Sequence, residues 1–165
     1  MSKFYIGIDN GVSGSIGIVS SDLDFKPIMI KTPVFSQQNY TKAKANINRI
    51  DTKKLKEFLL PYSKNCFLML ERPLVNPGRF KATTSALRAL EATLIVIEDL
   101  NIPFSYIDSK QWQKELLPSG LKGKELKTAS VDIGCRLFPH LLETIKSQKD
   151  GDGILIAEYI KRQGY

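Results

Sequence analysis

The sequence predicts an α/β domain built on a mixed five-stranded sheet, with three antiparallel strands followed by parallel strands and with helices flanking the sheet. Three short β-rich segments, separated by turn residues, lie near the N-terminus. A continuous apolar run follows at 66–70, and beyond it segments of helical length alternate with one further strand. The chain has 165 residues, of which 42% are hydrophobic and 25% charged, so it can bury a core and is not expected to be disordered.

The three N-terminal strands are expected at 4–8, 15–19 and 27–31. The turn cluster 10–14 joins the first two, and such short connections predict an antiparallel meander. Gly11, Gly14 and Gly17 permit a positive φ or a close approach of another backbone. This glycine pattern fits either a loop that cradles a phosphate or a plain tight hairpin.

The segment 36–50 is polar and basic, and we expect it to form an exposed surface loop. We expect the side chains of Tyr40, Lys42, Lys44 and Arg49 to be exposed. The composition is compatible with a loop that only meets water and equally with one that contacts a nucleic acid.

The remaining segments alternate between helix and strand. A helix capped by Asp51 should end at Pro61, and the apolar run 66–70 should be a central strand covered on both faces. The other elements are expected as a long helix at 81–100, a strand at 102–107, a short helix after Asp108 that carries Trp112, a helix at 122–138 and a last helix at 150–162. No repeat or linker divides the chain, so one domain over 1–165 is expected.

The composition excludes some classes of protein and favours others. Cys66, Cys135 and the single histidine, His140, cannot form a zinc cluster of familiar spacing, and reduced buried thiols are expected. No apolar run is long enough to span a bilayer, and the N-terminus does not look like a signal peptide, so a soluble cytoplasmic protein is expected. The net charge of +7 favours a polyanionic partner, although a basic surface can also serve solubility alone.

Acidic residues stand where predicted elements begin or end. Asp9 follows the first strand, Glu71 follows the central strand, and Asp150 and Asp152 open the last helix. Any one of them could be a solvated turn or helix-cap residue. Together they predict a site for Mg²⁺, or Mn²⁺ in its place, because carboxylate oxygens suit these ions. Two such ions about 3.5–4 Å apart can activate water and stabilise the leaving oxygen in phosphodiester hydrolysis.

Five segments resemble the RuvC-type Holliday junction resolvases of the ribonuclease H-like superfamily, in the phage and poxvirus-like branch. In chain order the segments are IGIDNGVSGSIGIV, LMLERP, IDSKQWQKELLP, KTASVDIGCRLFP and KDGDGILIAEY. The resemblance implies a ribonuclease H-like fold and a Mg²⁺-dependent endonuclease that cuts four-way DNA junctions with paired symmetric nicks, using two ions per site. It also implies that Asp9, Glu71, Asp150 and Asp152 are the catalytic metal ligands, and that the protein is of bacterial, phage or viral origin.

The last acidic pair departs from the family pattern. RuvC-like proteins usually place these two acids three or four positions apart, whereas Asp150 and Asp152 are two apart and Lys149 precedes them. Residues two apart do not face each other on a regular helix. Asp150 is therefore expected to reach the site from the loop or the helix cap, and Asp152 matches the motif better. If only three acids bind metal, Asp150 is the one to omit.

Basic and aromatic residues around these segments are candidates for DNA contact. They are Arg72, Arg79, Phe80, Lys81, Lys42, Lys44, Lys122, Lys124, Lys127 and Lys149. Most of the lysines could equally form a solvated face. Phe80 could instead pack as a hydrophobic staple at a helix start, and Trp112 is expected to be packed rather than stacked on a base.

The resemblance also implies a homodimer, because symmetric cutting of a junction needs two active sites. The helix at 83–100 has more apolar residues than one buried face requires, so it is the expected contact. Three other functions remain open. They are a ribonuclease H-like nuclease for flaps or RNA–DNA hybrids, an actin-like ATP-binding domain suggested by Asp9-Asn10-Gly11, and a junction-binding protein without catalysis.

Overall fold

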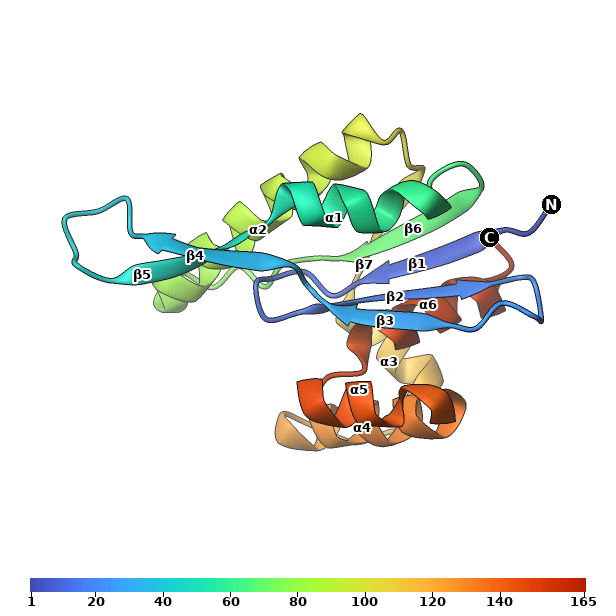
Figure 1. Ribbon diagram of the computed structural model, residues 1–165. Helices are drawn as coiled ribbons and strands as arrows, with labels where there is room; N and C mark the ends of the chain where they lie inside the picture. The colour runs from blue at the N-terminus through green and yellow to red at the C-terminus, as the bar shows by residue number, and fades with distance from the viewer.

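The computed structural model describes residues 1–165 and has a central five-stranded mixed sheet, as predicted (Figure 1). The strand order is β3-β2-β1-β6-β7, with bounds β1 Phe4–Ile8, β2 Ser15–Ser20, β3 Ile28–Lys31, β6 Cys66–Glu71 and β7 Phe104–Ile107. β1 to β3 form the predicted antiparallel meander, and β1, β6 and β7 are parallel. Parallel strands end at the same edge of a sheet, so residues that follow β1 and β6 are neighbours there.

Helices cover both faces of this sheet (Figure 1). One face carries α1 (Thr52–Leu59) and α2 (Phe80–Asp99), and the other carries α3 (Ser109–Leu116), α4 (Lys124–Leu137), α5 (Leu142–Gln148) and α6 (Asp152–Gln163). Alternation along β1 divides the core, since Tyr5 packs with the α6 side while Ile6 and Ile8 pack with the α1 and α2 side. None of these helices is long and apolar enough to cross a membrane.

The predicted loop at 36–50 is wrong, because this segment forms a β-hairpin. β4 (Val34–Gln38) pairs with β5 (Asn46–Ile50) in a separate two-stranded antiparallel sheet. Of the ten strand residues only Ile50 is buried. A hairpin that covers no core lacks the apolar alternation by which strands are recognised in a sequence. The expected exposure of Tyr40, Lys42, Lys44 and Arg49 is confirmed.

Smaller differences concern element ends and one missed helix. Short 3₁₀ turns occur at Leu60–Tyr62, Pro77–Arg79 and Pro139–Leu141, and α5 was not predicted from the sequence. The last helix begins at Asp152, so Asp150 lies before it, as its spacing required. The predicted caps are confirmed, since Asp51 accepts a hydrogen bond from the Lys54 amide and Asp108 forms a capping box with Gln111. Both cysteines are free thiols; Cys66 is buried as expected, whereas Cys135 is only half-buried.

Glycines allow α6 to lie directly against the first two strands. A Cβ atom at Gly7 would sit 2.3 Å from the Gly153 carbonyl oxygen, and one at Gly17 would sit 2.3 Å from the Ile154 Cα. A Cβ atom at Gly153 would sit 2.6 Å from the Ser15 carbonyl oxygen. The close-approach interpretation of Gly17 is therefore correct, and the contact sets how far the start of α6 lies from the end of β1.

Candidate metal centre

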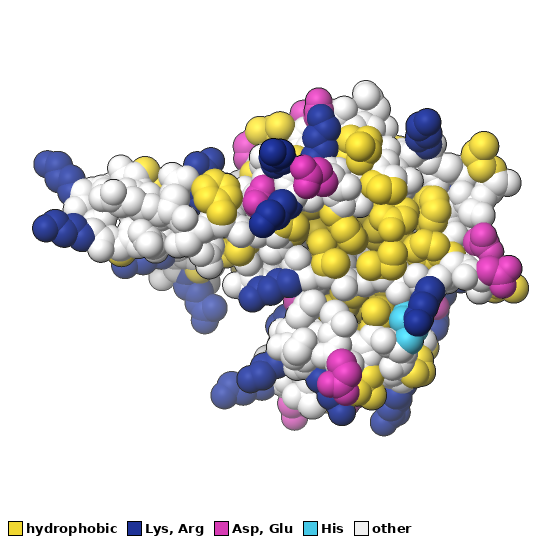
Figure 2. Space-filling view, viewed as in Figure 1, with side chains coloured by type: hydrophobic (Ala, Val, Ile, Leu, Met, Phe, Trp, Pro, Cys, Tyr) yellow, Lys and Arg dark blue, Asp and Glu magenta, His cyan; other side chains and the backbone are white.

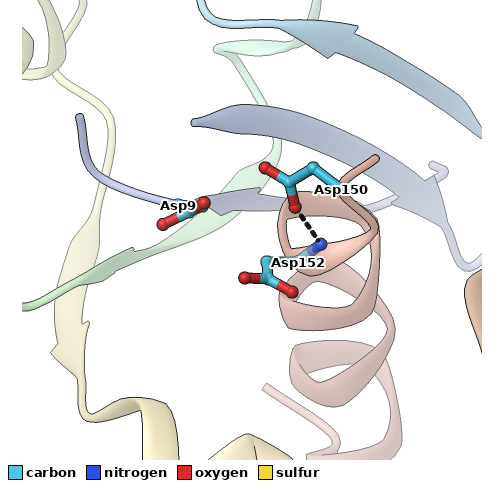
Figure 3. A group of neighbouring side chains, drawn as sticks. All are labelled: Asp9, Asp150 and Asp152. Carbon is cyan, nitrogen blue, oxygen red and sulfur yellow. Dashed lines mark hydrogen bonds between the residues drawn. The ribbon is translucent and has the colours of Figure 1, made fainter. Parts of the chain in front are cut away.

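Three carboxylates from the two ends of the chain converge at one edge of the sheet (Figure 3). Asp9 follows β1, Asp152 is the first residue of α6, and Asp150 lies two residues before it. One carboxylate oxygen from each of the three lies within 4.8 Å of the others. The Asp152 amide donates a 2.7 Å hydrogen bond to Asp150 Oδ1, which holds Asp150 beside the helix start. Asp150, the acid that spacing favoured least, therefore belongs to the cluster.

Glu71 lies on the neighbouring strand and faces the same cleft. Ile8 of β1 pairs with Leu70 of β6, so Asp9 and Glu71 are the next residues on adjacent parallel strands. Glu71, Asp9 and Asp152 line one cleft of about 820 Å³. The indole nitrogen of Trp112, which is 0% exposed, donates a 2.8 Å hydrogen bond to Glu71 Oε2. Trp112 is packed, as predicted, and in addition it orients Glu71, which the sequence did not reveal.

Two side chains of α4 orient Asp152. The Ser130 hydroxyl donates a short hydrogen bond to Asp152 Oδ1, and Lys127 Nζ lies 3.1 Å from Asp152 Oδ2. Lys127 Nζ also lies 3.9 Å from Asp150 Oδ1. The sequence predicted a contact between Lys127 and DNA. In this structure the Lys127 ammonium group forms ion pairs with Asp152 and Asp150.

The carboxylates are buried and close together, which makes it costly for all of them to be ionised. Burial, followed by the charges of Asp150 and Glu71, raises the pKa of Asp9 well above its ordinary value. Burial also raises the pKa of Asp150, with Asp152 adding to the shift and Lys127 opposing it. The pKa of Glu71 rises to about 7, mainly through burial, although the hydrogen bond from Trp112 lowers it.

The residues present fit a divalent cation. Asp150 Oδ2 is buried and has no hydrogen-bond donor, although a buried carboxylate oxygen normally needs one. The donor set consists of carboxylate oxygens, which suit Mg²⁺ or Mn²⁺. A bound cation would occupy the open coordination of Asp150 and offset the repulsion among the carboxylates. Asp9, Asp150 and Asp152 are the residues placed to hold it, and Glu71 lies beside Asp9 on the adjacent strand and lines the same cleft.

The raised pKa values predict an unusual dependence of stability on pH in the metal-free protein. Because the folded state binds protons more tightly than the unfolded state, the free energy of unfolding should decrease as the pH rises. Glu71 should contribute fully to the free energy of unfolding below the pKa of its unfolded state, about 4.3. This contribution should be lost as the pH rises through the folded-state pKa of about 7. Thermal melts in EDTA should therefore give a lower melting temperature at pH 8 than at pH 5.

Mn²⁺ should reverse this trend, because it binds ionised carboxylates better than protonated ones. The increase in melting temperature on adding Mn²⁺ should be larger at pH 8 than at pH 5. Two outcomes would contradict the assignment of these buried carboxylates to a cation site. One is an equal increase in melting temperature with Mn²⁺ at pH 5 and pH 8, and the other is a melting temperature in EDTA that does not fall between pH 5 and pH 8.

The other predicted site residues divide into those that reach the cleft and those that do not. Arg72, Arg79 and Lys127 line it. Arg72 is fixed by a 3.1 Å ion pair with Asp108 and by stacking over the Tyr106 ring at 5.0 Å. Phe80 is 73% exposed, so the staple interpretation is wrong.

The remaining lysines lie on nearby or more distant surfaces. Lys81, Lys122 and Lys124 are exposed, and Lys122 lines a neighbouring hollow with Lys110. Lys149 ends α5 in the left-handed conformation and lines a further hollow together with Lys127. Lys42 and Lys44 lie on the loop between β4 and β5, away from the cleft.

Known proteins resemble this chain in structure but not detectably in sequence. No family model and no curated protein matches the sequence. The structure of T. thermophilus RuvC in complex with a Holliday junction substrate is similar over 98% of this chain and 96% of that one, with 14% identity and a TM-score of 0.60. A second Thermus thermophilus RuvC structure has the same coverage and identity and a TM-score of 0.54.

The chain thus has the ribonuclease H-like fold, with a mixed five-stranded sheet flanked by helices. Within that class its architecture is that of RuvC, as the sequence motifs predicted. Assignment to the phage and poxvirus-like branch stays a prediction.

Proposed function

We propose that residues 1–165 form a metal-dependent DNA endonuclease domain that resolves Holliday junctions. The observation that carries the proposal is the convergence of Asp9, Asp150 and Asp152, with Glu71 lining the same cleft, at the sheet edge of a RuvC fold. Similar structures include a RuvC bound to a junction substrate, which supports branched DNA as the ligand.

In this proposal the four acids hold two Mg²⁺ ions. When bound, the ions would supply an activated water and stabilise the leaving oxygen of the cut phosphodiester. Ser130 and Trp112 keep Asp152 and Glu71 in one orientation each, so the ligand set is formed before the metal arrives. Arg72 and Arg79 place positive charge along the cleft, where they can hold the phosphates on either side of the cut.

Lys127 has a part of its own in this arrangement. Its ammonium group contacts Asp152 and Asp150, and it also lines the cleft. Burial lowers the pKa of Lys127, but the charges of Asp152 and Asp150 outweigh burial and raise it, so the group stays protonated. It therefore offsets carboxylate repulsion when no metal is bound, and it can contact the scissile phosphate when the aspartates hold cations.

The remaining candidate residues would form the wider DNA surface. Phe80 and Lys81 begin α2 beside the cleft, where Phe80 presents an exposed aromatic ring to an unstacked base. Lys122, Lys124 and Lys149 would contact phosphates on the side of the cleft formed by α4.

The test is a comparison of DNA substrates under one set of conditions. Labelled four-way junctions, flaps, plain duplexes and RNA–DNA hybrids should be incubated with Mg²⁺, with Mn²⁺ and with EDTA. Paired nicks placed symmetrically across the junction, only with metal, are expected. Cutting confined to hybrids or flaps would favour another ribonuclease H-like nuclease. Binding of ATP without any cutting would favour the actin-like alternative.

We also propose a homodimer through α2, because paired nicks need two active sites. Besides Phe80 at its start, the structure leaves two large apolar side chains of this helix open to solvent, Leu87 at 42% and Ile95 at 55% exposure, about two turns apart. Light scattering should give the mass of two chains for the unmodified protein. Ile95→Glu should give folded monomers that fail to pair their nicks, since a charge in an apolar contact is costly.

The matched control is Leu23→Glu, at a position 93% exposed in the turn between β2 and β3. This variant should remain dimeric. An unmodified protein that is monomeric, both free and on junction DNA, would contradict the dimer and the paired cuts that depend on it.

A further inference from the structure

The β4–β5 hairpin leaves the protein at the end of the sheet where the carboxylates lie. β1 and β3 are both antiparallel to β2, so β3 runs in the same direction as β1 and ends at the edge occupied by Asp9. The Thr32 amide donates a 3.0 Å hydrogen bond to the Gly14 carbonyl, which ties the start of the hairpin to the turn after Asp9. Figure 1 shows the hairpin extending well beyond the rest of the molecule on this side.

The hairpin keeps its shape although it covers almost no apolar surface. An isolated two-stranded sheet is only marginally stable, so other contacts must hold it. The Arg88 guanidinium of α2 lies 5.3 Å from the centre of the Tyr40 ring and fastens the loop of the hairpin to the helix. Within the loop, Asn39 Oδ1 accepts a hydrogen bond from the Thr41 amide, and the Asn39 amide donates to the Ala45 carbonyl. The structure thus contains an ordered projection, and the side chains of Lys42 and Lys44 on its loop are exposed.

The charge of this projection has one sign. No acidic residue occurs between Asp24 and Asp51, whereas Lys42, Lys44 and Arg49 lie on the hairpin. Lys42 and Lys44 are exposed, and neither forms an ion pair. Figure 2 shows lysine and arginine side chains at the far end of the projection with no acidic side chain near them. An ordered, wholly basic projection complements a polyanion.

We infer that the β4–β5 hairpin is a DNA-binding arm that contacts the phosphate backbone of duplex DNA at a distance from the cut. The inference rests on the proposed function for the identity of the polyanion. Five strand residues span about 17 Å, which corresponds to roughly five phosphate steps of about 3.4 Å along one strand. The arm should therefore touch a duplex about five base pairs beyond the active site. Contacts with phosphates carry no sequence information, so the arm would position the duplex without reading it.

The test pairs a protein variant with a DNA variant. The protein variant is Lys42→Ser/Lys44→Ser, and its control is Lys26→Ser/Lys64→Ser, which removes two exposed lysines at the opposite end of the sheet. Binding in EDTA is measured by fluorescence anisotropy on a junction and on a plain duplex. A second junction carries uncharged methylphosphonate linkages about four to seven base pairs from the crossover, around the estimated reach of the arm.

The hairpin variant should bind unmodified junction and duplex about tenfold or more weakly, and its plot of log affinity against log salt should be shallower by roughly 1.8. The control should bind like the unmodified protein. On the methylphosphonate junction, the unmodified protein should lose a similar factor, while the hairpin variant should lose almost nothing further. Circular dichroism should show equal melting for all three proteins.

Two outcomes distinguish failure of the arm hypothesis from failure of the proposed function. Equal binding by the hairpin variant and the control, on junction and duplex alike, would overturn the arm even if junctions are cut. An unmodified protein that does not prefer or cut junctions, with the hairpin variant still tenfold weaker on duplex, would overturn junction resolution and leave the arm supported.

Discussion

Replacing Asp9 with Asn should stop cleavage while leaving DNA binding intact or stronger. Asp9 contributes a carboxylate oxygen to the three-carboxylate cluster, and Asn offers only a neutral amide oxygen in its place. A loss of several kcal/mol of transition-state stabilisation corresponds to a rate at least about a thousandfold lower. Removing one negative charge from a cleft that faces phosphate should not weaken binding, and at low salt it should tighten binding. Single-turnover cleavage and anisotropy on the same junction measure the two effects separately.

The same variant can be tested without any substrate, because the chain has a single tryptophan beside the site. Trp112 donates its hydrogen bond to Glu71, so Mn²⁺ bound in the cleft should quench its fluorescence. Asp9→Asn should lose this quenching, and its metal-free form should melt at a higher temperature, since a buried carboxylate in a cluster of like charges is removed.

Asp24→Asn is the matched control, because Asp24 is exposed in the turn between β2 and β3. It should cut, bind and quench like the unmodified protein. If Asp9→Asn kept normal cleavage, the carboxylate cluster would not be the catalytic site. If the folded Asp9→Asn variant lost both cleavage and DNA binding, Asp9 would have a structural role in the DNA-binding surface and not a catalytic one.

Much of the fold could be predicted because its core strands follow simple patterns. The run 66–70 is apolar at every position, since β6 is covered on both faces, and the turn after β1 is marked by glycines. The hairpin could not be predicted in the same way. Its ten strand residues bury one side chain, so its stability comes from backbone pairing and from Arg88 on a distant helix, neither of which leaves a pattern in the local sequence.

The acids of the site were predictable for a topological reason, whereas their partners were not. Parallel strands bring Asp9 and Glu71 to one edge whatever the details of packing. The contact of Trp112 with Glu71 depends on where α3 lies relative to β6, and the contacts of Ser130 and Lys127 with Asp152 depend on how α4 packs on α6. That packing joins residues more than twenty positions apart, and no spacing rule encodes it. The periodicity of α4 could have placed Lys127 and Ser130 on one side of the helix, three residues apart, but not toward the metal site.

The position of α6 rests on the glycines of β1 and β2, so Gly17→Ala should disrupt both the fold and the site. The added Cβ would lie 2.3 Å from the Ile154 Cα and 2.5 Å from its nitrogen, and backbone atoms cannot rotate away as a side chain can. Overpacking of a core costs about 1–3 kcal/mol, occasionally more, and this backbone clash should lie at the upper end, near 3 kcal/mol.

The substitution should also disturb the metal site. Asp152 lies in the first turn of α6, and this helix can relieve the clash only by moving away from the sheet. Thermal melts should show a decrease of several degrees, and the variant that remains folded at low temperature should bind Mn²⁺ more weakly by Trp112 quenching. Gly78→Ala is the control, since a Cβ there would meet only the Asn76 side-chain oxygen, at 3.3 Å. If Gly17→Ala melted and bound Mn²⁺ like this control, the contact between strand and helix backbones would not be what brings Asp152 to Asp9.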